Sequence, residues 1–173
     1  MRYSSRIGVA TFVVCAVLSV TAISSGQEYS GKKLSDGTPV LVQQFKRDDL
    51  SSICAVDFSP DGRFIYASPW QIAAHVVAAV DEKTGKLTHV QTIQDADRIN
   101  GATGMRVSDD RQLAAAGAFR SRTISLYSRD PKTGKLTYKD HKQQGVDGVT
   151  GLSFPIDAFF SSDGKFVYGV DDR

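Results

Sequence analysis

The sequence has 173 residues, of which 21 are lysine or arginine and 19 are aspartate or glutamate. Arg2 and Arg6 are the only charged residues among the first 26, so the rest of the chain carries 19 basic and 19 acidic side chains. A chain without net charge and without a basic stripe has no general attraction for nucleic acid or for anionic lipid. We therefore expect no nucleic-acid partner.

The N-terminus contains the three parts of a secretory signal peptide in order. Two arginines precede an apolar run from Ile7 to about Val20, and small residues follow it. The run is shorter than the roughly 20 residues of a membrane span. We predict a signal peptide over residues 1–26, cleaved between Ser24 and Gln27, and an exported protein, periplasmic or extracellular, with no membrane span after cleavage. The alternative is an uncleaved N-terminal anchor.

After such cleavage Cys54 is the only cysteine left, so no intrachain disulfide can form. Its neighbours Ile53, Ala55 and Val56 are apolar. We expect Cys54 to be a small buried hydrophobic residue, not a nucleophile.

Two sequence elements recur along the chain in the same order. The strings FSPDGRFIYAS, VSDDRQLAAAG and FSSDGKFVYGV begin at Phe58, Val107 and Phe160, which are 49 and 53 residues apart. The string KTGKLT occurs at 83–88 and again at 132–137. A period near 50 without helical spacing is typical of the blades of a β-propeller.

Each repeat has the pattern of two hairpins. Apolar, β-branched and aromatic residues at Ile53 to Phe58 and at Arg63 to Ala67 flank the turn Pro60-Asp61-Gly62. Glycine takes the positive φ of such turns at little steric cost. Each unit therefore predicts a strand, an Asp-Gly turn, a strand, a variable loop, a strand, a Thr-Gly turn and a strand.

The predicted fold is all-β, an incomplete β-propeller of four-stranded antiparallel blades with a period of about 50 residues. Residues 27–52 form an N-terminal segment with one outer strand, at about Thr38 to Phe45. Blade 1 covers 53–101, blade 2 covers 102–154 and a partial blade 3 covers 155–173. Blade 2 departs from the pattern, because Asp110-Arg111 replaces Asp-Gly and Leu113 to Ala118 is rich in alanine.

A propeller closes only when typically four to eight blades complete a ring. Two full blades and part of a third leave strand edges open, which favours association. Three explanations stay open: a fragment or truncated product, assembly with copies of itself or with another chain that supplies further blades, or an unstable arc. We favour the first.

The repeats resemble those of the lactonase-type seven-bladed β-propellers, also called YVTN-type repeats. The resemblance rests on the Ser-Pro-Asp-Gly-Arg-Phe-Ile-Tyr string from Ser59, its copy from Ser161 and the Asp-Pro-Lys-Thr-Gly-Lys-Leu-Thr string from Asp130. It implies the architecture more strongly than an activity, since these motifs are turns and core strands. The family includes hydrolases of 6-phosphogluconolactone, but no catalytic residue of theirs can be matched here, so the catalytic residues are unknown.

Alternation of the strands places the short, nearly constant turns at one end of the blades and the longer, variable loops at the other. Ligand binding on a repeated scaffold usually resides in variable loops. The candidate ligand-binding residues on that rim are Trp70, His75, Asp97, Arg98, Asn100, Arg120 and Arg122. Arg120 and Arg122 could bind a carboxylate or phosphate, whereas Asp97, Arg98 and Asn100 could equally form a turn-stabilising network and His75 a satisfied strand residue.

The sequence contains no zinc pattern, no phosphate loop and no nucleophile elbow, so we expect neither a metal nor a cofactor. Two functions from different classes remain open. One is an exported lactonase-like repeat protein that acts as a binding scaffold for a small molecule, a glycan or a protein. The other is a carbohydrate-lactone hydrolase that is active only as a full-length or assembled propeller, so enzyme status stays open at this point.

Overall fold

The computed structural model describes residues 11–17, 39–46, 52–110 and 112–173. The described residues contain strands and turns but no helix, which confirms the predicted all-β class. The strands are β1 (Thr11–Val17), β2 (Pro39–Lys46), β3 (Ile53–Phe58), β4 (Phe64–Pro69), β5 (Ala74–Val80), β6 (Leu87–Gln94), β7 (Ala102–Val107), β8 (Leu113–Ala118), β9 (Thr123–Arg129), β10 (Leu136–Gln143), β11 (Pro155–Phe160) and β12 (Val167–Asp171).

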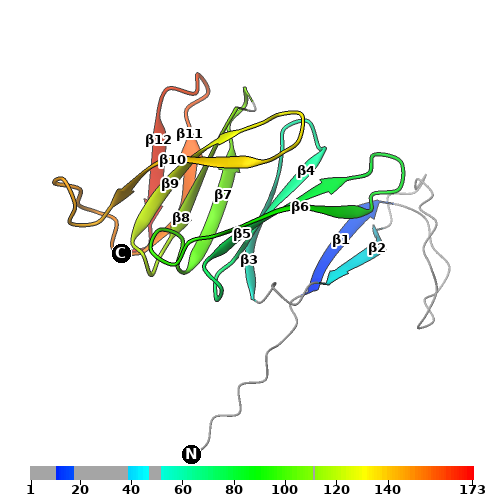
Figure 1. Cartoon of the computed structure of the whole chain (residues 1–173), viewed down its shortest axis with the longest axis horizontal. Helices are drawn as coiled ribbons and strands as arrows, with labels where there is room; N and C mark the ends of the chain where they lie inside the picture. The colour runs from blue at the N-terminus through cyan, green and yellow to red at the C-terminus, as the bar shows by residue number, and fades with distance from the viewer. Residues whose placement is uncertain (1–10, 18–38, 47–51, 111) are drawn as a thin grey trace, which may run out of the picture.

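The strands form four antiparallel sheets that follow one another across the molecule, from β1–β2 to β11–β12 (Figure 1). Two of them have four strands, in the orders β3-β4-β5-β6 and β7-β8-β9-β10. The other two, β1–β2 and β11–β12, have two strands each. Because β7 contacts both β3 and β11, the first strand of each of these three sheets lies on the inner side of the array. This arrangement confirms a partial propeller.

The repeated turns have the predicted backbone. Gly62, Gly134 and Gly164 have φ of 69°, 73° and 70°, a region that favours glycine. In the first turn Asp61 Oδ1 accepts hydrogen bonds from Ser59 Oγ at 2.6 Å and from the Arg63 backbone N–H at 3.2 Å. Arg111, which replaces the turn glycine in blade 2, lies outside the described residues.

The main core lies between blades 1 and 2. Alternation along β4 directs Phe64 and Tyr66 towards blade 2, and both are buried. They pack with Val77, with Ile99 of the segment that leads into blade 2, and with residues of blade 2, namely Met105, Ala114, Ala116, Tyr127 and Leu136. The small side chains of the alanine-rich β8 let the two sheets approach closely around the large rings of blade 1.

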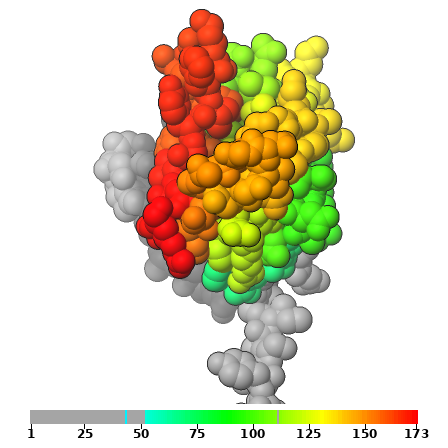
Figure 2. All heavy atoms as spheres, turned by 90° about the vertical axis from the view of Figure 1, so that its left-hand side faces the viewer, coloured from blue at the N-terminus to red at the C-terminus, as the bar shows by residue number. Residues whose placement is uncertain are grey.

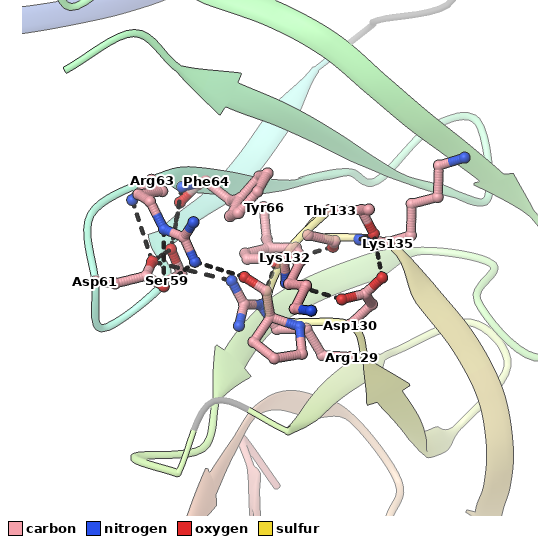
Figure 3. Close-up of polar contacts among 12 residues, drawn as sticks. Ser59, Asp61, Arg63, Phe64, Tyr66, Arg129, Asp130, Lys132, Thr133 and Lys135 are labelled. Atoms are coloured by element: carbon pink, nitrogen blue, oxygen red, sulfur yellow. Dashed lines mark hydrogen bonds and ion pairs between the residues drawn. The ribbon is translucent and has the colours of Figure 1, made fainter. Parts of the chain in front are cut away.

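A polar junction ties the same two blades together (Figure 3). The Tyr66 hydroxyl donates to the Gly134 carbonyl at 2.9 Å and accepts from Arg129 Nε at 2.5 Å. Arg63 donates to the Pro131 carbonyl at 2.6 Å. Burial would raise the pKa of Asp61, but the hydrogen bonds from Ser59 and Arg63 and the Arg63 charge outweigh it and lower that pKa to about 2. Asp61 is therefore ionised within this junction at neutral pH.

A glutamine clamp repeats on the outer strands. Gln91 of β6 accepts from the Leu136 N–H at 2.8 Å and donates to the Leu136 carbonyl at 3.0 Å. Gln43 of β2 makes the same pair of bonds with Leu87 of β6, at 2.6 and 3.4 Å. Each clamp joins the outer strand of one sheet to the outer strand of the next, so β2 occupies the position of a blade's fourth strand.

We expect Gln91→Met to lower the free energy of unfolding by about 1–3 kcal/mol, because two hydrogen bonds of about 0.5–1.5 kcal/mol each are lost. Urea denaturation followed by circular dichroism measures the change. Gln94→Met is the matched control on the same strand, since Gln94 is exposed, and it should stay within about 0.5 kcal/mol of the parent. Equal effects of the two variants would contradict a clamp at Gln91.

The outward face of β12 is open. Phe166 and Tyr168 occupy the repeat positions of Phe64 and Tyr66, yet they are 60% and 58% exposed, against 6% and 1% for the blade 1 pair. Figure 2 looks onto this end of the molecule and shows the C-terminal strand at the surface. The difference follows from position: the Phe64 face is covered by blade 2, whereas no described residue covers the Phe166 face.

Candidate functional site

Three charged side chains meet across the inner strands of three successive blades. Asp57 lies on β3, Arg106 on β7 and Asp157 on β11. Arg106 Nη2 lies 2.7 Å from Asp157 Oδ2, and Arg106 Nη1 lies 3.5 Å from Asp57 Oδ1. The three side chains remain partly open to solvent, with exposures of 27% for Asp57, 37% for Arg106 and 17% for Asp157. We call these three residues the inner triad.

The geometry of the inner triad depends on a glycine. A Cβ atom on Gly104 would lie 2.2 Å from Asp157 Oδ1, so a larger residue there would displace the carboxylate. Arg106 is further held by the ring of Phe159, whose centroid lies 5.1 Å from its guanidinium carbon. Arg106 is thus fixed by its ion pair with Asp157 and by its cation–π contact with Phe159.

The two carboxylates differ in their environments. Desolvation raises the pKa of Asp57, and the negative charge of Asp157 adds to it, while Arg106 and backbone hydrogen bonds act against both. Asp157 has the shorter bond to Arg106. A carboxylate of raised pKa beside a positioned guanidinium is an arrangement suited to general-base chemistry.

The residues of the inner triad were not among those predicted from the sequence. Their signal was a single charged residue within each inner strand, in the strings ICAVDF, ATGMRV and PIDAFF. Charged residues are depleted from strands that pack on both faces, so their presence there is informative. The candidate residues were instead predicted on the rim, because the variable loops lie there.

On the rim, the structure brings together two of the predicted residues. Trp70 follows β4 and Arg120 lies between β8 and β9, and the guanidinium carbon of Arg120 lies 5.0 Å from the Trp70 ring centroid. Phe119 completes the group. Its ring centroid lies 5.5 Å from that of Trp70 and 5.1 Å from the guanidinium carbon of Arg120. Phe154, ahead of β11, continues the row at 4.7 Å from Phe119.

The residues predicted between the blades form a turn network. The Arg98 guanidinium forms an ion pair with Asp95 and lies 4.4 Å from the Tyr138 ring centroid. The backbone N–H groups of Asp97 and Arg98 donate to Asp95 Oδ1. Asn100 contributes its backbone, since its N–H donates to Ser121 Oγ at 2.9 Å. This segment holds the loop that carries Arg120.

The other two predicted residues lie apart from that group. Arg122 is exposed at the end of the same loop, with φ of 54°. His75 is completely buried, so it is not exposed on the rim as its candidate role requires. Its Nδ1 lies 3.2 Å from Ser68 Oγ, its ring meets Tyr127 edge-on, and burial lowers its pKa to about 3. His75 is a neutral residue of the interface between blades.

The sequence profile of the lactonase family of seven-bladed β-propellers matches residues 18–154, most of the chain. The chain belongs to this family. No curated protein matches it.

Solved structures support the same fold. The periplasmic gluconolactonase PpgL of Pseudomonas aeruginosa is 26% identical to this chain, with a TM-score of 0.57. The match covers 69% of this chain and 32% of the PpgL chain. A protein of Bacteroides uniformis described as a candidate 6-phosphogluconolactonase is 19% identical with a TM-score of 0.65, covering 80% of this chain and 39% of its own. This lactonase propeller chain therefore spans about a third of the length of these relatives.

Cys54 of the lactonase propeller chain is exposed, so the expectation that it is buried was wrong. A register shift between Ile53 and Ala55 displaces it from the regular ladder, and its Sγ donates to the Ala102 carbonyl at 3.7 Å. Desolvation and the Asp157 charge raise the pKa of the thiol. The thiol is therefore protonated at neutral pH, which disfavours a nucleophilic role.

Within the described part of the lactonase propeller, no cluster of three or more histidine, cysteine, aspartate or glutamate side chains could hold a metal ion. The same residues include no helix that is long and apolar enough to cross a membrane.

Proposed function

We propose that the chain contributes to a propeller that hydrolyses a sugar lactone, with the inner triad as its catalytic group. The observation that carries this proposal is the position of Asp57, 3.5 Å from Arg106 on the adjacent inner strand, where desolvation raises the pKa of the carboxyl. Family membership and the relatedness to a periplasmic gluconolactonase support the choice of a lactone as substrate. Because the chain spans a third of its relatives, the active species is a larger ring that contains these blades.

The chemistry assigns one role to each residue of the triad. The Asp57 carboxylate removes a proton from a water molecule, and the oxygen of that water attacks the lactone carbonyl carbon. The Arg106 guanidinium stabilises the negative charge that develops on the carbonyl oxygen. The ring C–O bond then breaks, and the leaving oxygen takes up the proton from Asp57, so the product is an open-chain sugar acid.

Asp157 is the positioning residue in this scheme. Its 2.7 Å ion pair fixes the Arg106 guanidinium, and its negative charge contributes to the raised pKa of Asp57. A base must be deprotonated to act and is stronger when its pKa is higher. Asp157 thereby adjusts Asp57 without contacting the lactone.

Hydrolysis of D-glucono-1,5-lactone by the purified protein tests this function. Acid release can be followed with a pH indicator and corrected for spontaneous opening of the lactone. Turnover that depends on Asp57 supports a hydrolase. Saturable binding of the lactone without turnover would instead support a binding scaffold.

We also propose that the protein is exported, on the basis of the two arginines, the apolar run and the small residues of the first 26 positions. Expression in a bacterium with a periplasm should give a mature protein that begins between Ser25 and Gln27, which intact-mass spectrometry and N-terminal sequencing can measure. Cleavage would remove β1, which pairs with β2 in the structure. A periplasmic product that retains Thr11–Val17, or a protein that stays in the cytoplasm, would contradict signal cleavage.

A further inference from the structure

Trp70, Phe119 and Arg120 contact one another, and we call them the rim group. It lies at the end of the blades opposite the Asp-Gly and Thr-Gly turns, because Trp70 follows β4 and the other two follow β8. It does not include any residue of the inner triad. Its chemistry is that of a fixed, exposed cation.

Backbone hydrogen bonds join the loop that carries Arg120 to the segment that contains Asn100 and Gly101. The backbone N–H groups of Arg120 and Ser121 donate to the Asn100 carbonyl at 3.2 and 3.1 Å, and that of Phe119 donates to the Gly101 carbonyl at 3.0 Å. A Cβ on Gly101 would lie 2.6 Å from the Phe119 ring, so the glycine allows the ring to pack there. The position of Arg120 is therefore set by the backbone.

The guanidinium of Arg120 is held over two rings, 5.0 Å from the Trp70 centroid and 5.1 Å from the Phe119 centroid. Stacking uses the face of a guanidinium and leaves its N–H edge free for hydrogen bonds. Among the described residues, no carboxylate forms an ion pair with Arg120. Arg63, Arg98, Arg106 and Arg129, by contrast, each lie within 4.0 Å of an aspartate oxygen.

We propose that the rim group is a binding site for the oxyanion of a small ligand, a carboxylate or a phosphate, held by the N–H edge of Arg120. A planar guanidinium whose orientation is already fixed loses little entropy on binding and matches the two oxygens of such a group. Hydrolysis at the inner triad is not required for this binding, so the two proposals can fail separately.

Isothermal titration of the purified protein with three probes tests the site. D-gluconate presents a carboxylate, D-glucose 6-phosphate presents a phosphate, and D-glucose presents neither. We expect saturable one-to-one binding of at least one anion and none of glucose, and the stronger of the two anions identifies the oxyanion. Binding of neither anion, or equal binding of glucose, would overturn the proposal.

Variants separate a built site from general electrostatic attraction. Arg120→Gln should weaken anion binding at least tenfold, and Arg120→Lys should weaken it severalfold, because an ammonium lacks the planar fork. Trp70→Leu should also weaken it severalfold although the charge stays. Lys132→Gln removes an exposed cation from the opposite end of the blades and should leave the affinity unchanged.

Circular dichroism of each variant establishes that the fold is retained. Equal losses in Arg120→Gln and Lys132→Gln would show attraction by net charge alone and would sink the proposal. Full affinity in Trp70→Leu would contradict the role of the Trp70 ring in holding Arg120 for the anion. A loss in Arg106→Gln would place the anion at the inner triad instead and would overturn the proposal, because Arg106 is the cation of that triad.

Discussion

Replacing Asp57 by asparagine is expected to reduce lactone hydrolysis by about 10²- to 10⁴-fold, the usual contribution of a general base. The amide keeps the shape of the side chain but cannot accept the proton of water. Initial rates of D-glucono-1,5-lactone hydrolysis measure the effect. Asp109→Asn is the control, because Asp109 is an exposed aspartate in the Asp-Asp-Arg turn of blade 2, away from the inner triad.

The dependence of hydrolysis on pH gives a second readout of the same residue. Activity requires ionised Asp57, so it should fall as the pH drops through the pKa of this carboxyl, which desolvation raises above the ordinary 3.8. Removing the Arg106 charge by Arg106→Gln should move this acid limb to higher pH. Removing the Asp157 charge by Asp157→Asn should move it to lower pH. Opposite shifts would identify Asp57 as the titrating base, since a purely structural role predicts neither.

An unchanged rate in Asp57→Asn would exclude the inner triad as the catalytic group. A rate that falls equally in Asp57→Asn and Asp109→Asn would point to a general loss of folded protein. Thermal unfolding of both variants, followed by circular dichroism, distinguishes these cases.

The largest expected loss of stability comes from Gly134→Ala. Gly134 has φ of 73°, and an added Cβ would lie 2.3 Å from Cδ1 of Phe64, a ring buried between blades 1 and 2. The positive φ costs about 1 kcal/mol for alanine, and overpacking a core costs about 1–3 kcal/mol more. We therefore expect the free energy of unfolding to fall by about 2–4 kcal/mol, measured by urea denaturation.

Gly62→Ala is the matched control for that loss. Gly62 has φ of 69°, but a Cβ there would have no atom within 4 Å. Its cost should be the backbone strain alone, about 1 kcal/mol. The difference between the two variants measures how tightly the Thr-Gly turn of blade 2 packs on blade 1. Equal losses would mean that the two blades are not packed as the structure has them.

Most of the fold could be predicted because its determinants are local. Two apolar runs around Asp61-Gly62 indicate a hairpin by themselves, and its recurrence at Asp163-Gly164 indicates a repeated unit. The glutamine clamp could not be predicted in the same way. Gln91 and Leu136 are 45 residues apart, and their contact depends on how successive sheets stack.

The candidate site was predicted only in part, for the same reason. Trp70 and Arg120 were chosen as loop residues, and the structure places them in contact. His75 has the side chain of a catalytic base, but alternation along β5 places it in the interface beside Tyr127. Asp57 and Arg106 occupy equivalent positions of two repeats. They form an ion pair because the inner strands β3 and β7 lie side by side, which the sequence alone does not show.

The most direct test of the proposed function is lactone hydrolysis measured across the fractions of a size-exclusion separation, with the mass of each fraction determined by light scattering. Turnover should appear in a fraction whose mass corresponds to a closed assembly of blades, and it should disappear from the same fraction of Asp57→Asn. Absence of turnover from every folded fraction, or turnover that survives in Asp57→Asn, would contradict lactone hydrolysis by the inner triad.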